Sequence, residues 1–180
     1  MIPCQIVGQP GSGKTTLIVD IITEMIRAGV TVGSIKHTAH AYELDKPGKD
    51  SFRHRQAGAA PAAMMTRDMA AVYLPRTADM TPETLLEKFY AHLDVVLIEG
   101  WISGPFNKIE IWRKALEKPL LFPDVPGIKA IVSDDPLPHD TNKRATENHV
   151  SCFRRNAVSD IAAFIIGRLS GLTPDAGASI

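Results

Sequence analysis

The stretch that decides the fold is Gly8-Gln9-Pro10-Gly11-Ser12-Gly13-Lys14-Thr15, near the start of a 180-residue chain. A short apolar run at residues 2–7 precedes it and predicts a strand. Apolar residues at three- and four-residue spacing over 17–26 follow it and predict a helix. Residues 30–36 then resemble a second strand. This order of strand, turn, helix and strand predicts a right-handed βαβ unit and a parallel sheet.

The glycine-rich turn matches the phosphate-binding pattern G-x-x-x-x-G-K-T in full, and we name residues 8–15 the phosphate-binding loop. Its glycines let several backbone N–H groups turn toward one phosphate, beside the positive end of the following helix. We expect Lys14 to reach the β- and γ-phosphates as a catalytic residue, and the Thr15 hydroxyl to bind Mg²⁺. The predicted phosphate contacts in and beside the loop are Gly8, Gly11, Ser12, Gly13, Lys14, Thr15 and Thr16. A chance glycine-rich turn is the alternative, which the strand-turn-helix context disfavours.

The metal also needs a carboxylate, and the usual place is the end of a neighbouring apolar strand. Residues 94–98 predict a buried parallel strand, with Asp94 at its start and Glu99 directly after it. The two acids are roughly 17 Å apart along a strand, so only one can serve. Ligands bind at the carboxyl ends of parallel strands. We therefore predict Glu99 as the Mg²⁺ ligand and second catalytic residue, Gly100 as a close approach to phosphate, and Asp94 as a solvated strand start.

The polar segment 37–51 follows the second predicted strand, and its length indicates a functional loop. Within it we predict that Asp50 binds Mg²⁺, directly or through water, and that Lys49 contacts phosphate. A solvated surface turn is the alternative. His37 and His40 have no clustered third ligand, so they do not predict a zinc site.

The base of the nucleotide is predicted from acids that follow a late strand. Residues 128–132 predict that strand, and Ser133-Asp134-Asp135 come next. An aspartate accepts hydrogen bonds, and guanine N1 and N2 donate them. We therefore predict Asp134 as the base contact and GTP as the nucleotide. The motif Asn-Lys-x-Asp is incomplete at Asn142, where Ala145 replaces the aspartate, so the pattern leaves ATP open.

The remaining elements complete the expected fold. We predict a helix over 50–57, short strands at 62–65 and 70–74, and a half-exposed strand at 108–112. A helix capped by Thr81 is expected to bury Leu85, Leu86, Phe89 and Leu93, and a last helix over 157–169 to bury Val158, Ile161, Ala162, Ile165 and Leu169. We expect 134–156 to be irregular and 172–180 to be a disordered tail. Together these predict one α/β domain over 1–171, with the three-layer P-loop NTPase fold and a mostly parallel sheet flanked by helices.

Charge and composition exclude several classes of protein. The chain carries 20 basic and 20 acidic residues, which argues against binding nucleic acid or an anionic membrane by bulk charge. No apolar run reaches the ~18 residues of a membrane span, and the start lacks the pattern of a secretory signal. Cys4 and Cys152 predict one buried and one free thiol in a reducing compartment. We therefore predict a cytoplasmic protein with no nucleic-acid or membrane partner.

Taken together, the motifs resemble the MobB family, the molybdopterin-guanine dinucleotide biosynthesis adaptor proteins, over about residues 2–135. The residues that carry this resemblance are the phosphate-binding loop with Thr16 and Leu17, Ile35-Lys36-His37-Thr38, Asp45-Lys46-Pro47-Gly48-Lys49-Asp50-Ser51 with Arg53 and Ala57-Gly58-Ala59, Leu97-Ile98-Glu99-Gly100, and Lys108-Ile109-Glu110. The resemblance implies a GTP- and Mg²⁺-binding protein with weak GTPase activity. It also implies a guanylyltransferase partner of the MobA kind, molybdopterin as a further ligand, and a homodimer. One departure is Ala39, where the family usually has a histidine.

Two other functions stay open at this stage. A small-molecule or nucleoside kinase would use the same phosphate-binding loop, with an arginine-rich lid for which Arg144, Arg154 and Arg155 are the candidates. A degenerate loop that binds no nucleotide is the third possibility, and the intact Lys14 and Thr15 argue against it.

Overall fold

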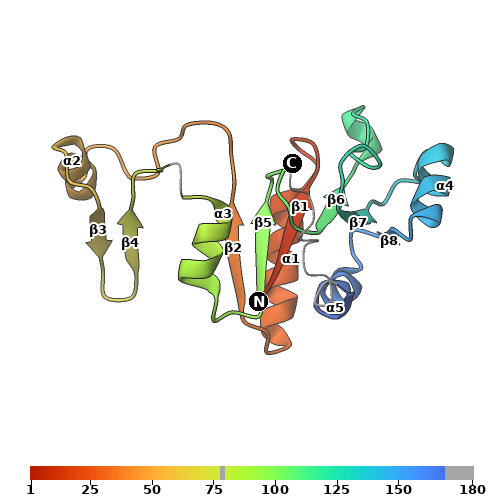
Figure 1. Cartoon of the computed structure of the whole chain (residues 1–180), viewed down its shortest axis with the longest axis horizontal. Coiled ribbons are helices and arrows are strands. Elements are labelled where there is room, and N and C mark those ends of the chain that lie inside the picture. Colours follow the sequence, from red (N-terminus) through yellow and green to blue (C-terminus); the bar gives the residue numbers. More distant parts are fainter. Residues whose placement is uncertain (78–79, 169–180) are drawn as a thin grey trace, which may run out of the picture. The chain divides into compact units, whose positions relative to one another are not determined.

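The computed structural model describes residues 1–77 and 80–168, and Figure 1 shows the elements in chain order. The chain forms two compact units, one of Met1–Thr38 with Leu86–Ile180 and the other of Ala39–Leu85. The predicted single domain over 1–171 stays a prediction, and the predicted tail at 172–180 lies outside the described residues, as does Leu169.

The first unit is built on a sheet of six strands in the order β2-β5-β1-β6-β7-β8, and every neighbouring pair is parallel. The strands are β1 (Ile2–Val7), β2 (Val32–Lys36), β5 (Val95–Glu99), β6 (Lys108–Ile111), β7 (Ile128–Val132) and β8 (Ser151–Phe153). The strands predicted at 2–7, 30–36, 94–98 and 128–132 are confirmed, and so is the α/β fold. Because all strands run the same way, their carboxyl ends meet at one edge of the sheet.

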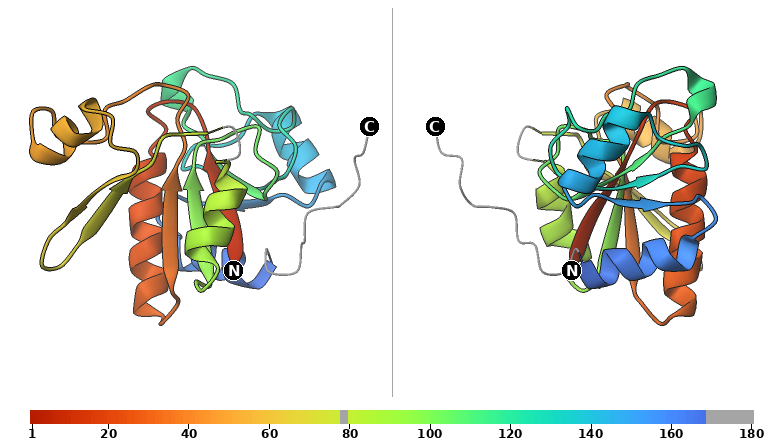
Figure 2. Two further views of the ribbon diagram at one scale, coloured as in Figure 1. Left: turned by 60° about the vertical axis from the view of Figure 1, so that its left-hand side comes forward. Right: turned by 90° about the vertical axis from the view of Figure 1, so that its right-hand side faces the viewer.

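One face of the sheet packs against α1 (Lys14–Arg27) and α5 (Val158–Arg168), which lie side by side in Figure 2. Alternation along the strands turns Cys4, Ile6, Val95 and Leu97 to this face, where they meet the apolar stripes of both helices. Cys4 is fully buried, and burial raises the pKa of its thiol to about 12. Cys152 is exposed and the two thiols are unpaired, as predicted.

The opposite face is covered by η1 (Leu86–Tyr90) and α4 (His139–Glu147), which completes three layers. Leu86 and Tyr90 pack with Val96 and Ile98. Phe89 was predicted to be buried, and this is wrong, because 53% of it is exposed. The segment forms a π-helix, whose wider turn brings residues five apart in contact and no longer aligns Phe89 with the buried face.

The prediction of a half-exposed strand at 108–112 is also wrong, because all four residues of β6 are buried between β1 and β7. Lys108 Nζ donates to the Gly104 and Phe106 carbonyls at 2.6 and 3.1 Å. The Glu110 carboxylate accepts the backbone N–H groups of Leu121 and Phe122 at 2.6 and 3.0 Å. The alternating pattern thus comes from two buried charges, each bonded to backbone groups.

The segment 134–156 is not irregular as predicted, since it contains α4 and β8. Nearly every residue of α4 is polar and only Ala145 is buried, so the sequence has no apolar periodicity to detect. β8 is a three-residue edge strand, shorter than a sequence pattern can define.

The second unit contains α2 (Asp50–Gln56), an antiparallel hairpin of β3 (Ala62–Met65) and β4 (Ala70–Tyr73), and α3 (Pro82–Leu85). The helix predicted at 50–57 and the strands predicted at 62–65 and 70–74 are confirmed. The Thr81 hydroxyl caps α3 by accepting the N–H of Thr84 at 3.3 Å. Arg55 pairs with Glu43 at 2.6 Å and lies over the Tyr73 ring at 5.1 Å. Arg55 is therefore part of the packing of this unit.

Across the described ranges, no helix is long and apolar enough to cross a membrane. The predicted cytoplasmic location remains a prediction.

Glu110 provides a direct test of this packing. Replacing it with glutamine keeps an acceptor for one of the two backbone N–H groups and turns an amide donor toward the other, so we expect the free energy of unfolding in urea to fall by about 1–3 kcal/mol. The matched control Glu147→Gln changes an exposed residue of α4 and should stay within about 0.5 kcal/mol of wild type.

Wild type and the Glu110→Gln variant also test the charge state of Glu110. Burial raises the pKa of this carboxyl above 4.5, against the opposing effect of the Leu121 and Phe122 N–H groups. Just above pH 4.5 the folded protein therefore keeps a proton that the unfolded chain releases, so Glu110 makes the protein less stable as the pH rises through this window. The glutamine variant should lack this slope, and an identical pH profile for both proteins would contradict the assignment.

Candidate phosphate and metal site

The phosphate-binding loop joins the carboxyl end of β1 to the first turn of α1. Gly8, Gly11 and Gly13 have φ angles of 144°, 81° and 97°, which side-chain-bearing residues rarely adopt. A Cβ atom on Gly8 would lie 2.3 Å from the carbonyl oxygen of Ile111, and Gly13 is the residue directly before α1. The sharp turn that the motif predicted is therefore present, with glycine required by conformation and by space.

Ser12 lies inside this turn with only 1% of its surface exposed. Within the part of the chain that the structure describes, its hydroxyl oxygen has no hydrogen-bond partner. Buried hydroxyl groups nearly always have a partner, so an unpaired one lining a cavity is suited to a polar ligand. Ser12 lines a cavity beside the loop.

Lys14 is half-buried and folds back over the loop, where its Nζ donates to the carbonyls of Gly8 and Gln9 at 2.9 Å each. Burial lowers the pKa of Lys14, the carboxylate of Glu99 opposes that shift, and the charge of Lys36 adds to it. The ammonium group is thus held at the loop, close to one carboxylate and to a second lysine.

Glu99 ends β5, and its Oε1 accepts the Thr15 hydroxyl at 2.9 Å. The same oxygen lies 3.3 Å from Lys36 Nζ. Alternation along β5 places Glu99 on the face of Val95 and Leu97, which is the face that α1 covers. The first turn of α1 and the end of β5 therefore converge on this carboxylate.

Asp94 stands before the first residue of β5, at the opposite end from Glu99. It is exposed, as predicted, and its Oδ2 accepts the hydroxyl of Thr31 at 2.7 Å and the N–H of Thr31 at 2.9 Å. These hydrogen bonds, that of the Thr31 side chain first, lower the pKa of Asp94. The strand direction predicted for the two acids is confirmed, and Glu99 is the one beside the phosphate-binding loop.

The pair of Thr15 hydroxyl and Glu99 carboxylate offers hard oxygen ligands, the type that Mg²⁺ prefers. The described stretches contain no cluster of three His, Cys, Asp or Glu side chains that could enclose a metal. A Mg²⁺ ion held by one or two protein oxygens with phosphate and water needs no such cluster. The residues present fit this type of metal site.

Gly100 was predicted to allow phosphate to approach, but the structure gives it another reason to be glycine. Its φ is 82°, and a Cβ there would lie 2.9 Å from the His37 carbonyl oxygen. Its phosphate contact remains a prediction. Trp101 follows with φ 55° and stacks on the His37 ring at 5.7 Å, so this tryptophan packs the end of β5 against the end of β2.

A cavity of about 400 Å³ opens beside the loop. Its lining includes Ser12, Gly13, Thr16, Asp134, Asp135 and Arg155. The structure thus brings the predicted base contact Asp134 to the same cavity as the phosphate-binding loop. The Asp134 Oδ1 accepts the Arg155 N–H at 2.9 Å, and the Arg155 side chain pairs with Asp20 at 2.7 Å.

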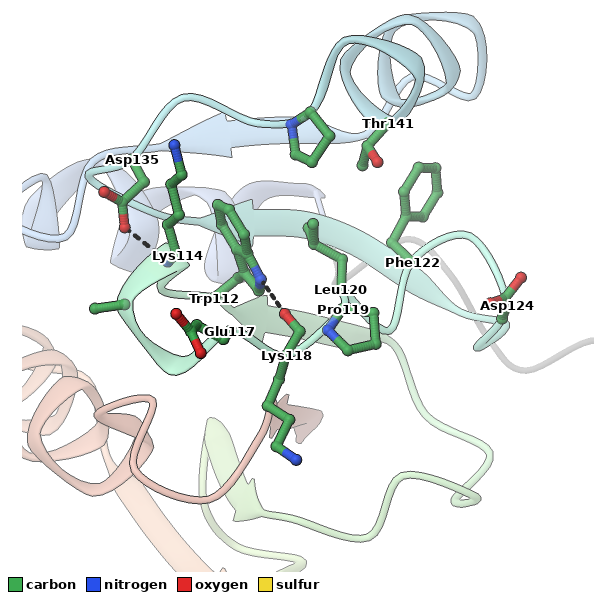
Figure 3. Close-up of a pocket in the computed structure, with 12 residues that line it drawn as sticks. Trp112, Lys114, Glu117, Lys118, Pro119, Leu120, Phe122, Asp124, Asp135 and Thr141 are labelled. Atoms are coloured by element: carbon green, nitrogen blue, oxygen red, sulfur yellow. Dashed lines mark hydrogen bonds between the residues drawn. The ribbon is translucent and has the colours of Figure 1, made fainter.

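A larger pocket of about 810 Å³ adjoins the first, and the two share Trp112, Ala115 and Asp135. Figure 3 shows the rings of Trp112 and Phe122 on either side of Leu120. The Trp112 Nε1–H donates to the Lys118 carbonyl at 2.9 Å, and Asp135 Oδ2 accepts the Lys114 N–H at 2.9 Å. These bonds fix the segment after β6 as the wall between the two pockets.

Two residues of the site were missed from the sequence. Lys36 lies beside Glu99 because β2 is the neighbour of β5 and ends at the same edge, and Asp135 lines both pockets beside the predicted Asp134. The signal for Lys36 was its place as the last residue of a predicted strand. Lys49 and Asp50 belong to the second unit, directly before α2 and at its first residue, and their phosphate and Mg²⁺ contacts stay predictions.

Comparison with known proteins gives a consistent result. The family model of molybdopterin guanine dinucleotide synthesis protein B, MobB, matches residues 4–134. The chain is 34% identical over 137 residues to a molybdopterin-guanine dinucleotide biosynthesis adapter protein of Haemophilus influenzae, covering 75% of this chain and 76% of that protein. It is 31% identical over 160 residues to the Escherichia coli adapter protein, covering 87% and 86%. A crystal structure of molybdopterin-guanine biosynthesis protein B has the same fold, with a TM-score of 0.69, 24% identity, and coverage of 93% of this chain and 100% of that one.

Gly8→Ala tests the turn at the start of the loop. The new Cβ would clash with the Ile111 carbonyl, and the φ angle of Gly8 is unfavourable for alanine. We therefore expect the free energy of unfolding in urea to fall by about 3 kcal/mol or more. Gly29→Ala is the matched control, because its φ is 81° with nothing within 4 Å of the added Cβ. That control should lose only about 1–2 kcal/mol. Equal losses in the two variants would show that space at Gly8 is not limiting.

Proposed function

The chain belongs to the family of molybdopterin guanine dinucleotide synthesis protein B, and from this membership we propose that it is a GTP-binding adapter with weak GTPase activity in the synthesis of molybdopterin guanine dinucleotide. The observation that carries the proposal is the Thr15–Glu99 hydrogen bond of 2.9 Å at the phosphate-binding loop. It brings a hydroxyl and a carboxylate together at the position where a loop-bound nucleotide carries its metal.

In this proposal each group of the loop has one task. The turned backbone and the N-terminal end of α1 bind phosphate oxygens, and the Lys14 ammonium leaves the Gly8 and Gln9 carbonyls to pair with the terminal phosphates. Thr15 and Glu99 hold Mg²⁺, which neutralises charge on the phosphates. Slow hydrolysis is expected because Glu99 serves the metal and does not orient an attacking water.

Guanine is the base we propose, since Asp134 and Asp135 present carboxylates to the cavity beside the loop. Carboxylates accept hydrogen bonds, which suits the N1 and N2 donors of guanine and not the acceptor N1 of adenine. As an adapter the protein would act with a MobA-like guanylyltransferase, with molybdopterin as the second substrate, and as a homodimer. The curated relatives carry the word adapter in their names, which supports a role beside partner enzymes.

The kinase alternative receives less support. Its lid candidates were Arg144, Arg154 and Arg155, but Arg155 is paired with Asp20, and Arg154 donates to the Asp134 carbonyl. Arg155 is part of the wall of the cavity beside the loop, and a closing lid needs its arginines released.

Lys14→Ala tests nucleotide binding. We expect it to weaken GTP binding by at least about 100-fold in isothermal titration with Mg²⁺, because a charge-assisted contact to phosphate is lost. The urea midpoint should stay unchanged, since Lys14 is half-buried and its Nζ donates to the Gly8 and Gln9 carbonyls of the loop. The same variant should fail to support guanine dinucleotide formation in a reconstituted assay with the guanylyltransferase. Wild-type GTP affinity in this variant would rule out the phosphate-binding role of the loop.

Glu99→Gln and Asp94→Asn test the metal site as a matched pair, since each removes one charge at one end of β5. We expect the glutamine variant to reduce the gain in GTP affinity that Mg²⁺ provides by about 10-fold or more. The asparagine variant should leave this gain within about twofold of wild type, because the Asp94 carboxylate bonds to Thr31 at the far end of the strand. A larger loss from Asp94→Asn would show that the metal binds at the opposite edge of the sheet from Glu99.

A further inference from the structure

We propose that Lys36 is a second phosphate-binding cation, which Glu99 holds until a metal ion takes that carboxylate, and which then contacts the terminal phosphate of a nucleoside triphosphate. The inference rests on the proposed function and extends it to a residue that distinguishes triphosphate from diphosphate. It starts from the place of Lys36 in the sheet.

Lys36 ends β2 and is the register partner of Glu99, the last residue of β5. Partners in a parallel pair point to the same face, and Val32 and Val95 at the other end of these strands contact the core under α1. Lys36 and Glu99 therefore project together beside the first turn of α1. This register puts the lysine at the edge where the phosphate-binding loop ends.

One oxygen of the Glu99 carboxylate contacts both Thr15 and Lys36. Glu99 Oε1 accepts the Thr15 hydroxyl at 2.9 Å and lies 3.3 Å from Lys36 Nζ. A metal ion bound by Thr15 and Glu99 would compete with Lys36 for the Glu99 carboxylate. Its positive charge would repel the Lys36 ammonium from the carboxylate, so the lysine would need another anion as a partner.

A purely structural ion pair is the simpler explanation of Lys36, and the exposure of the lysine argues against it. The Lys36 side chain is 67% exposed, and the Glu99 side chain is 15% exposed. An ion pair whose lysine is held in solvent adds little to stability. A long side chain that is free to turn on its strand end is better suited to follow a ligand.

The charges around the phosphate-binding loop indicate which anion Lys36 would bind. The Lys14 ammonium is close enough to Glu99 and to Lys36 for the Glu99 carboxylate to raise its pKa and for the Lys36 charge to lower it. Two ammonium groups facing one carboxylate leave excess positive charge at the loop. A triphosphate brings the negative charge that balances it, and its terminal phosphate is the group a diphosphate lacks.

The experiment compares Lys36→Gln with the matched control Lys129→Gln, which removes a charge from an exposed position on β7. The dissociation constants of a non-hydrolysable GTP analogue and of GDP are measured by isothermal titration, with Mg²⁺ and with EDTA. We expect Lys36→Gln to weaken the binding of the triphosphate analogue about 10- to 100-fold with Mg²⁺ and to change the dissociation constant of GDP less than threefold. The loss should be smaller in EDTA, and Lys36→Arg should restore most of it. Lys129→Gln should resemble wild type throughout.

The outcomes separate this inference from the proposed function. If wild type and Lys129→Gln bind no guanine nucleotide, the proposed function fails. If they bind it but Lys36→Gln weakens both nucleotides equally, or neither, only the role of Lys36 is overturned. An unchanged urea midpoint for Lys36→Gln excludes misfolding as the cause of a loss.

Discussion

The hydrogen bond between Thr15 and Glu99 is the interaction on which the proposed site depends. It exists because β1 and β5 are parallel and in register, with Ile6 beside Glu99, so the loop after β1 and the end of β5 reach the same edge. The alternating core residues of β5 turn Glu99 to the side of α1, and the glycine turn places Thr15 in the first helical turn above it. Sheet register, turn geometry and helix packing thus position one carboxylate.

Much of this arrangement could be predicted from the sequence because its causes are local. The spacing of Gly8, Gly13 and Lys14 specifies the turn, and apolar periodicity specifies α1 and the four predicted parallel strands. Strand direction was enough to choose Glu99 over Asp94. Where a buried charge is bonded to the backbone of a loop, prediction failed. Lys108 and Glu110 on β6 resembled a solvated face, because their partners are backbone groups of the loops on either side of that strand.

The order of strands in the sheet is the information that the sequence lacks. β2 lies next to β5, although the whole second unit separates them in the chain, and this is why Lys36 meets Glu99. The same limitation applies to the pockets, since Asp135 and Trp112 meet at their shared wall only because β6 and β7 are neighbours. The helix α4 was missed for a different reason, because a helix with one buried residue has no apolar stripe.

The most direct measurement of the central claim is the affinity of the wild-type chain for GTP and ATP, each titrated with Mg²⁺ and with EDTA. The Thr15–Glu99 pair predicts that Mg²⁺ tightens the binding of GTP by about 10-fold or more, and Asp134 with Asp135 predicts that GTP binds more tightly than ATP. Affinities that do not change when Mg²⁺ is removed would contradict the metal site. Equal affinities for GTP and ATP would contradict the base assignment, and no binding at all would contradict the account as a whole.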